Sequence, residues 1–303
     1  MTRPGAEPPA RIEDLVRELV ATPGRLLVVS DFDGTLAPIT TEPLATRILP
    51  AARSALRRLA RLAADRPDRL RVVVLSGRSA RDVAGRVRVG GLTYQGNHGL
   101  EWGRLARRAR AERLAVATDE TFSPFVAGAR ALGLVVADRL GRPDWLFVED
   151  KGPTVAFHFR QAPDADAARI AILGAIAAAE TELGDHGLVA FEGRKVIEFR
   201  PVRAGGKGDA VERLIARDEP AAVLVMGDDK SDAEAFVAVR AARSARTVRG
   251  LALAVHGAAE TPPEILAAAD AELPDPAAAA RVLGWVARLL EAERRPGATS
   301  ASV

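Results

Sequence analysis

Three short apolar runs, each followed at once by small or acidic residues, restrict the folds open to this chain most strongly. Leu26–Ser30 leads into Asp31-Phe32-Asp33-Gly34-Thr35, Leu70–Leu75 into Ser76-Gly77, and Ala222–Met226 into Gly227-Asp228-Asp229. Runs this short and this apolar are typical of strands buried on both faces of a parallel sheet. In open α/β folds the carboxyl ends of such strands share one edge, where ligands bind. We therefore expect the polar residues after these runs to lie close together.

Segments with helical spacing alternate with the apolar runs. The pattern predicts helices near 12–20, 51–64, 79–88, 207–217, 231–240 and 276–292, and further strands at 92–95 and 251–255. An alternation of strand and helix favours a doubly wound, mostly parallel, Rossmann-like α/β sheet.

The middle of the chain departs from this rhythm. We expect an Arg-rich helix over 104–132, an Ala-rich helix over 164–182, and hairpin-like strand pairs at 145–148 with 154–160 and 188–191 with 196–199. Such pairs with helices indicate an inserted α+β module. The predicted organisation is a discontinuous core (1–102 and 202–303) that carries an insert (103–201), with disorder at 1–10 and 294–303.

Composition excludes several classes of site and compartment. The 303 residues include no cysteine, which excludes disulfides, thiolate catalysis, thiolate zinc sites and iron–sulfur clusters. No apolar run reaches the ~18 residues that cross a bilayer, and the first residues, MTRPGAEPPARIEDL, lack a signal-peptide core. We expect a cytoplasmic protein without a membrane partner.

The charge balance does not indicate a nucleic-acid partner. Lys and Arg total 43 against 40 Asp and Glu, and lysine occurs only at 151, 195, 207 and 230. A near-balance of this kind is no basic stripe. We interpret the many arginines, including the run at 104–113, as coding bias and solvated surface, which makes each lysine more informative.

The carboxylates that follow the first and third runs predict a metal site. Asp31 and Asp33 follow one strand, and Asp228 and Asp229 follow another. Hard oxygen ligands of this kind suit Mg²⁺. The alternative for a single Asp is a helix N-cap, which accounts for Asp232 or Ser231 but not for the Asp228-Asp229 pair.

Two further segments predict a bound phosphoryl group. Ser76 and Gly77 follow a strand, and Lys207 stands among glycines where a helix opens. A strand-end hydroxyl can bond a phosphoryl oxygen, and a helix N-terminus with a lysine attracts an anion. The alternatives are a turn or N-cap serine and a solvated surface lysine.

These four segments, in this order, resemble the haloacid dehalogenase superfamily of aspartate-nucleophile phosphatases. Finer motifs resemble those of the trehalose-6-phosphate phosphatases: Gly96–Glu101, Val148–Gly152, Phe157–Arg160, Gly193–Pro201 and Leu273–Pro276. The family usually reads Gly-Asp-Asp-x-Thr-Asp-Glu, whereas this chain has Ser231 and Ala233 in place of the Thr and Glu.

The resemblance implies a reaction and a set of roles. Asp31 would attack phosphorus and form an aspartyl phosphate, while Asp33 would serve as acid and then as base. The other implied residues are Asp31, the Asp33 carbonyl, Asp228 and Asp229 for Mg²⁺, Ser76, Gly77 and Lys207 for phosphate, and Asn97, His98, Glu149, Lys151, Arg160, Arg194 and Glu198 for substrate.

The leading hypothesis is therefore Mg²⁺-dependent hydrolysis of trehalose 6-phosphate, a small-molecule substrate, by a monomer. Three alternatives stay open: a phosphatase for sucrose phosphate or a glycosyl-phosphoglycerate, a phosphomutase, and a non-catalytic sugar-phosphate-binding module. His186 and His256 are interpreted as structural or surface residues, and without the resemblance the charged insert residues would be interpreted as ordinary surface charge.

Overall fold

The computed structural model describes residues 9–40, 45–118, 120–184, 187–193, 195–202, 204–257 and 261–293. The described residues divide into two compact units, one made of those up to 117 and from 206 onward, the other of those from 118 to 205. The disorder expected at 1–8 and 294–303 lies outside the described residues. Residues 9 and 10, also expected to be loose, begin the first helix.

The first unit is built on a sheet of eight strands in the order β12-β11-β10-β1-β2-β3-β4-β5. Neighbours from β12 to β3 pair in parallel, and β4 pairs antiparallel with β3. The strands are β1 (Leu26–Ser30), β2 (Leu70–Leu75), β3 (Thr93–Gly96), β4 (Glu101–Arg104), β5 (Ala117–Thr118), β10 (Ala222–Gly227), β11 (Arg249–Val255) and β12 (Ala271–Leu273).

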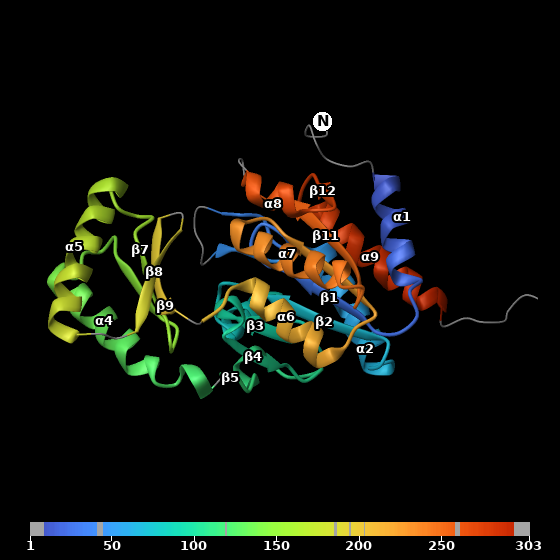
Figure 1. The fold of residues 1–303 in the computed structure, drawn as a ribbon, viewed down its shortest axis with the longest axis horizontal. Coiled ribbons are helices and arrows are strands. Elements are labelled where there is room, and N and C mark those ends of the chain that lie inside the picture. The colour runs from blue at the N-terminus through green and yellow to red at the C-terminus, as the bar shows by residue number, and fades with distance from the viewer. Residues whose placement is uncertain are drawn as a thin grey trace, which may run out of the picture. The chain divides into compact units, whose positions relative to one another are not determined.

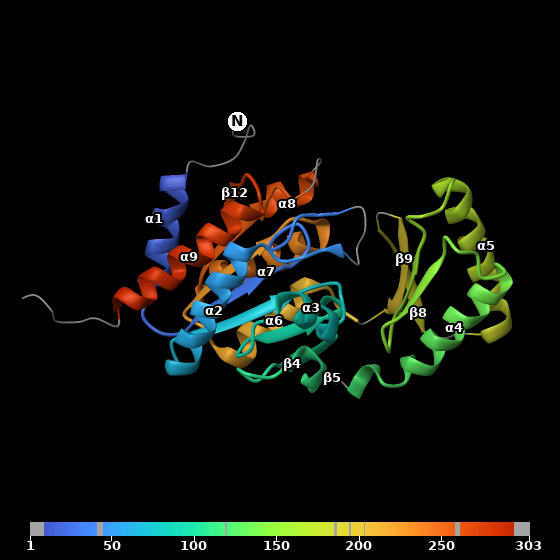
Figure 2. The same cartoon turned by 180° about the vertical axis from the view of Figure 1, so that it is seen from behind.

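Helices cover both faces of this sheet because its central strands are apolar on both sides. Successive side chains of a strand point to opposite faces, so Leu26 and Val28 join one core cluster while Leu27 and Val29 join the other. The first cluster is covered by α1 (Pro9–Val20), α2 (Pro50–Asp65), α3 (Ala80–Val87) and α9 (Pro276–Glu293), the second by α6 (Lys207–Asp218), α7 (Lys230–Ser244) and α8 (Pro263–Ala268). Figure 1 shows α6 and α7 on the near face, and Figure 2 shows α2 and α3 from behind.

The second unit is a four-stranded antiparallel sheet with two helices on one face (Figure 1). Its elements are α4 (Phe125–Arg139), β6 (Phe147–Asp150), β7 (Val155–His158), α5 (Ala165–Leu183), β8 (Leu188–Gly193) and β9 (Val196–Pro201), and the strand order is β6-β7-β9-β8. Phe157 and Ile197 pack with Leu132 and Ile172 of the helices. The opposite face carries Glu149 of β6 and Glu198 of β9.

The Arg-rich helix predicted over 104–132 is wrong in its first half. Residues 101–104 form β4 beside β3, and the helix begins only at Phe125. Helix propensity is a weak prior: pairing with β3 overrides it at Arg104, and residues 105–116 form loops, a turn and the short 3₁₀ turn Ala111–Arg113 instead of a helix. A Cβ on Gly103 would lie 2.4 Å from the Ala115 carbonyl oxygen, so strand and following loop pack too closely for another residue. The two compact units divide after Ala117 and after Gly205.

The remaining predicted elements agree with the structure to within a few residues, and the fold class is confirmed as α/β with a mostly parallel sheet. The short α8 and β12 were not predicted. Within the described residues, no helix combines the length and the apolar character that spanning a bilayer requires.

Candidate active site

The central strand β1 brings three of the predicted segments together. β1 lies between β10 and β2, with Ser30 opposite Met226 on one side and Val74 on the other. Asp31 follows β1, Ser76 follows β2 and Asp228 follows β10, so all three stand at one edge of the sheet. The Asp31 N–H continues the ladder by donating to the Met226 carbonyl at 3.0 Å. Parallel pairing thus accounts for the meeting of residues that are far apart in the chain.

Lys207, the first residue of α6, is the cation of this edge. Its Nζ lies 2.8 Å from Asp31 Oδ1 and 2.8 Å from Asp232 Oδ1, with Asp229 Oδ1 at 3.8 Å. The side chain is only 2% exposed. A lysine this deeply buried is tolerated because carboxylates surround it, so the surface-lysine alternative is excluded.

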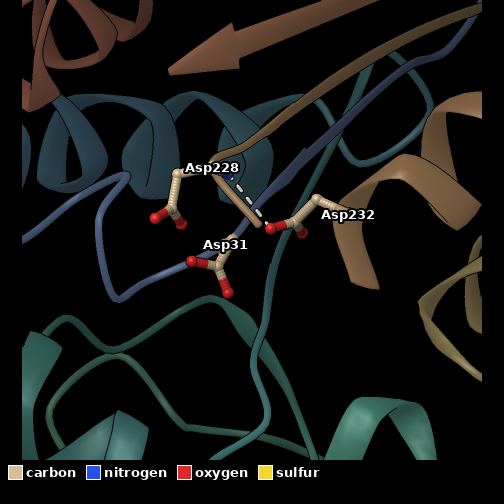
Figure 3. Close-up of side chains that lie close together, drawn as sticks. All are labelled: Asp31, Asp228 and Asp232. Atoms are coloured by element: carbon tan, nitrogen blue, oxygen red, sulfur yellow. Dashed lines mark hydrogen bonds between the residues drawn. The ribbon is translucent and has the colours of Figure 1, made fainter. Parts of the chain in front are cut away.

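Three buried carboxylates, Asp31, Asp228 and Asp232, face one another beside this lysine (Figure 3). One oxygen from each can be chosen so that all lie within 4.8 Å of one another. Asp232 is already engaged, because its Oδ1 accepts from Lys207 and its Oδ2 accepts from the backbone N–H groups of Asp228 and Asp229. No donor among the described residues hydrogen-bonds the Asp228 carboxylate. Asp31 and Asp228 thus have the oxygens best placed for a ligand.

Burial and crowding shift the proton affinities of these groups. Burial raises the pKa of Asp31 to about 6, although Lys207 opposes the shift. Burial and then the charge of Asp31 raise the pKa of Asp228 well above its usual range. Burial alone would lower the pKa of Lys207, but Asp229, Asp232 and Asp31 together raise it well above its ordinary value. The edge carries more negative charge than one ammonium neutralises.

Gly34 allows the β1 loop to pass close to this cluster. Its φ of +77° lies in the region that favours glycine, and a Cβ would lie 2.0 Å from an oxygen of Asp228. A Cβ on Gly227 would similarly lie 2.1 Å from the carboxyl carbon of Asp232. Gly34 and Gly227 are therefore required, because the carboxylates of Asp228 and Asp232 leave no space for a side chain at these positions.

Asp33 lies in a different setting from Asp31, because it pairs with an arginine. Arg78 Nε and one terminal nitrogen donate to the two Asp33 oxygens at 2.7 and 2.8 Å. The same guanidinium donates to Asp82 at 3.1 Å and lies 5.8 Å from the centre of the Phe32 ring. The two-bond pairing orients the Asp33 carboxylate as a single bond would not.

Two neighbouring loops pack against each other here. One follows β2 and holds Ser76 and Gly77, and the other follows β3 and holds Asn97 and His98. Ser76 is buried, and its Oγ accepts from the Arg78 N–H at 3.2 Å. The His98 N–H donates to the Ser76 carbonyl at 3.0 Å, and a Cβ on Gly77 would lie 2.8 Å from the His98 ring. Asn97 and His98 have φ values of +49° and +56°. Both angles lie in the left-handed region, where asparagine and histidine are found more often than most other residues with a side chain.

Three of the charged residues predicted to bind substrate, Glu149, Lys151 and Glu198, lie close together in the second unit. Glu149 of β6 and Glu198 of β9 lie opposite the same residue, Ala156 of β7. Lys151 Nζ lies 3.2 Å from Glu198 and 3.8 Å from Glu149, whose carboxylate is also 3.0 Å from His158 Nε2. Burial would raise the pKa of Glu149, but the His158 hydrogen bond and Lys151 lower it. Arg160 is exposed after β7, and Arg194 lies outside the described residues.

Comparison with known proteins places the chain in a family. Residues 29–261 match the family model described as trehalose-phosphatase. The matched stretch is well over half of the chain and contains Asp31, Ser76, Lys207 and Asp228. The chain belongs to the trehalose-phosphatase family. The resemblance stated from the motifs is thereby confirmed at the level of the family.

Curated relatives of this trehalose-phosphatase family member include longer proteins. A trehalose-phosphate phosphatase of Mycobacterium avium is 37% identical over 219 residues, which cover 70% of this chain and 51% of that protein. Another, of Mycobacterium marinum, is 36% identical over 246 residues, 77% of this chain and 56% of that protein. An uncharacterized glycosyl hydrolase of Mycobacterium tuberculosis is 36% identical over 224 residues, 71% of this chain and 15% of its own length. The chain spans about half the length of these phosphatases.

Solved structures show the same fold. The C-terminal domain of trehalose-6-phosphate phosphatase from Candida albicans superposes with a TM-score of 0.68 at 18% identity, covering 95% of this chain and 99% of that one. A trehalose-6-phosphate phosphatase related protein superposes with a TM-score of 0.66 at 18% identity, covering 89% of this chain and 100% of that one. At these identities the likeness supports the fold alone.

Two residues of this trehalose-phosphatase site were missed by sequence reasoning. Asp232 was attributed to a helix N-terminus, yet Asp229 is the N-cap of α7 and Asp232 pairs with Lys207. Arg78 follows Ser76 and Gly77 in the sequence, and no role was predicted for it from the sequence. Spacing offered one signal for each: Asp232 stands one helical turn after Asp228, and Arg78 stands three residues after the end of β2. Of the departures from the family motif, Ser231 donates to Asp229 at 2.7 Å and Ala233 is buried against the core.

Proposed function

We propose that this family member is a phosphatase that hydrolyses trehalose 6-phosphate to trehalose and inorganic phosphate. The observation that carries the proposal is the buried Asp31 carboxylate held 2.8 Å from Lys207 and beside Asp228. A carboxylate can attack phosphorus. The fixed ammonium beside it can stabilise the negative charge of the phosphoryl group. The relatives named trehalose-phosphate phosphatase supply the substrate class.

The proposed reaction has two displacements. In the first, an oxygen of Asp31 forms a bond to phosphorus while the bond from phosphorus to the sugar oxygen breaks, and Asp33 transfers a proton to that oxygen. In the second, Asp33 takes a proton from water, which attacks phosphorus and releases Asp31 and phosphate. Asp31, with its pKa at about 6, is ionised near neutral pH and can therefore act as the nucleophile.

Three residues suit the phosphoryl oxygens. Lys207 remains positively charged, and the Ser76 Oγ accepts from Arg78, which leaves its hydroxyl hydrogen for an oxygen of the substrate. Gly77 follows Ser76 without a side chain. Charge stabilisation of this kind is a principal source of catalysis in phosphoryl transfer.

The donor set fits Mg²⁺. The Asp228 carboxylate is buried without a hydrogen-bond donor among the described residues, and the repulsion between it and Asp31 calls for a further positive charge. Mg²⁺ prefers carboxylate, carbonyl and water oxygens. Asp31, Asp228 and the Asp33 carbonyl would hold the ion, with Asp229 in support. When bound, Mg²⁺ supplies positive charge beside the transferred phosphoryl group.

We infer further that the second unit acts as a cap that selects the sugar. Glu149, Lys151 and Glu198 share one sheet face, and carboxylates can accept paired hydrogen bonds from sugar hydroxyls. Arg160 and Arg194 of this unit, and Asn97 and His98 of the first unit, complete the proposed substrate-binding set. The discontinuous first unit is then the catalytic core.

The test is phosphate release from trehalose 6-phosphate with and without added Mg²⁺. The wild-type protein is expected to release phosphate with Mg²⁺ and to lose most of the rate in EDTA. The Asp31→Asn variant is expected to fold, as circular dichroism would report, and to release none. Activity that survives in a folded Asp31→Asn variant would contradict the nucleophile assignment.

A panel of substrates separates this proposal from the alternatives. Sucrose phosphate, a glycosyl-phosphoglycerate and glucose 6-phosphate are assayed beside trehalose 6-phosphate. We expect the highest kcat/KM for trehalose 6-phosphate, and equal values throughout would exclude the specificity. An isomerised sugar phosphate without free phosphate would indicate a mutase, and binding without turnover a non-catalytic module.

Two expectations from the sequence stay predictions. They are that the protein works in the cytoplasm and that it is a monomer which takes a small sugar phosphate. Light scattering after size exclusion measures the mass, and a dimer would contradict the second expectation.

A further inference from the structure

A hollow lies in the first unit, and the residues that line it do not include those of the carboxylate cluster. It has a volume of about 500 Å³ and lies between α2, α3, the chain around Thr46 and the 3₁₀ turn Ala111–Arg113. Arg47, Arg53, Arg81, Arg86 and Arg88 line it. None of the residues assigned to catalysis, phosphate or metal lines this hollow, which we call the arginine pocket.

The arginine pocket carries unbalanced positive charge. Its five guanidinium groups face two carboxylates, Asp82 and Glu112. Asp82 is already shared between Arg86 at 2.8 Å and Arg78 at 3.1 Å. Within the described part of the chain, no carboxylate forms an ion pair with the four other lining arginines. The lining has a formal excess of three positive charges, which equals the net charge of the whole chain. Positive charge is therefore more concentrated in this pocket than over the rest of the protein.

Backbone carbonyls hold three of these guanidinium groups in place without neutralising them. Arg53 donates to the carbonyls of Arg86 and Val87 at 3.3 and 3.2 Å, Arg81 donates to Leu114 at 3.3 Å, and Arg88 donates to Gly85 at 3.1 Å. Each group retains further N–H donors, since a guanidinium has five. These three side chains are therefore positioned before any ligand arrives, which reduces the entropy cost of binding one.

The mutual repulsion of these arginines is visible at Arg53. Burial, followed by the charges of Arg57, Arg88 and Arg47, lowers the pKa of this group. An anion between the guanidinium groups would relieve that repulsion. The planar fork of arginine matches the oxygens of phosphate with two parallel hydrogen bonds.

We propose that the arginine pocket is a second, non-catalytic binding site for a small polyanion that carries phosphate groups. Its volume lies within the range of ~300–1,000 Å³ that small-molecule sites occupy. Its polar, cationic lining selects charge rather than apolar surface. The site does not depend on the proposed phosphatase activity, because it shares no assigned residue with the catalytic edge.

The test is isothermal titration of the intact protein with inorganic tripolyphosphate, without added metal. The pocket variant carries Arg47→Gln and Arg88→Asn. Asparagine suits position 88 because its φ is +55°, in the left-handed region that asparagine tolerates. The matched control carries Arg61→Gln and Arg281→Gln, two exposed arginines away from the arginine pocket that lose the same charge.

We expect a loss of affinity of about tenfold or more in the pocket variant, the equivalent of about one charge-assisted hydrogen bond. The control should bind as the wild type does. Any binding of tripolyphosphate at the catalytic edge contributes equally to both variants, so their difference reports the arginine pocket. Equal affinity in the two variants, or an equal loss in both, would overturn the proposal. Circular dichroism and thermal unfolding verify that both variants fold.

Discussion

At the scale of single residues, the charge balance of the catalytic edge depends on Lys207. It is the one ammonium among the described residues that contacts Asp31 and Asp232, at 2.8 Å each, and all three side chains are almost fully buried. Removing one member of a buried charged group leaves its partners unpaired in a medium of low dielectric constant. The Lys207 side chain is therefore needed both for the stability of the fold and for the proposed chemistry.

Lys207→Met is expected to destabilise the protein by about 3–5 kcal/mol, the usual cost of breaking a buried ion pair from one side. Urea unfolding followed by circular dichroism measures the change in the free energy of unfolding. Lys230→Met is the matched control, because Lys230 is 78% exposed and lies 3.7 Å from a half-exposed Glu264. The control should change stability by less than about 1 kcal/mol. A similar change in both variants would show that Lys207 is not a structural counterion.

A second prediction concerns Arg78, which holds the Asp33 carboxylate with two hydrogen bonds and would affect catalysis by orienting it. Arg78→Ala is expected to lower kcat for trehalose 6-phosphate by about a hundredfold, since a freed Asp33 samples geometries unsuited to proton transfer. KM should change little. Arg78→Lys keeps the charge but not the two parallel bonds at 2.7 and 2.8 Å, and an intermediate kcat is expected. A kcat for Arg78→Ala equal to that of Arg281→Gln would exclude a positioning role.

At the scale of elements, the site depends on loops that follow strands and pass close to one another. The turn after β1 places Gly34 against Asp228, and Gly257, after β11, would carry a Cβ only 2.3 Å from the Gly34 carbonyl oxygen. Three strands thus hold their terminal loops in contact. The spacing of neighbouring strands leaves no room for a side chain at these positions.

Gly34→Ala is therefore expected to displace Asp228 or the β1 turn. Phosphatase activity should fall by about tenfold or more, with a loss of stability of about 1–3 kcal/mol because φ is +77°. Activity and urea unfolding are measured together. Gly284→Ala, within α9, is the control, since nothing lies within 4 Å of its Cβ position. The control should gain about 0.5–1 kcal/mol of stability and keep its activity. Unchanged activity in Gly34→Ala would show that the close approach is dispensable.

At the scale of the whole molecule, a doubly wound sheet concentrates negative charge at one rim. A carboxyl whose pKa rises on folding, as that of Asp31 does from 3.8 to about 6, contributes most stability below its ordinary pKa. That contribution is lost as the pH rises toward 6. The metal-free protein therefore carries an electrostatic cost near neutral pH that a bound cation would offset.

Mg²⁺ is accordingly expected to raise the Tm more at about pH 7.5 than at about pH 5, because protons occupy the raised carboxyls at the lower pH. Differential scanning calorimetry with MgCl₂ or with EDTA gives the Tm difference at each pH. Asp228→Asn should abolish most of the difference. An equal effect of Mg²⁺ at both pH values would show that Asp31 and Asp228 do not take part in binding it.

Most helices and strands, and the types of residue at their ends, could be predicted from the amino-acid sequence alone. The runs at 26–30, 70–75 and 222–226 correspond to β1, β2 and β10 within one residue, and the helix predicted from Lys207 begins there. These predictions succeed because a strand buried on both faces must be apolar at nearly every position, a property visible without any partner. The residue types that follow the strands then indicated phosphate and metal chemistry.

Which side chains meet could not be predicted from the sequence, because it depends on how the elements pack in three dimensions. This packing made Asp232 rather than Asp229 the close partner of Lys207, joined Arg78 to Asp33, and turned residues 101–104 into a strand. Lys207 and Asp31 are 176 residues apart. Contacts at such separations depend on how crossover helices pack and how loops turn, whereas periodicity along one element reports only the burial of that element.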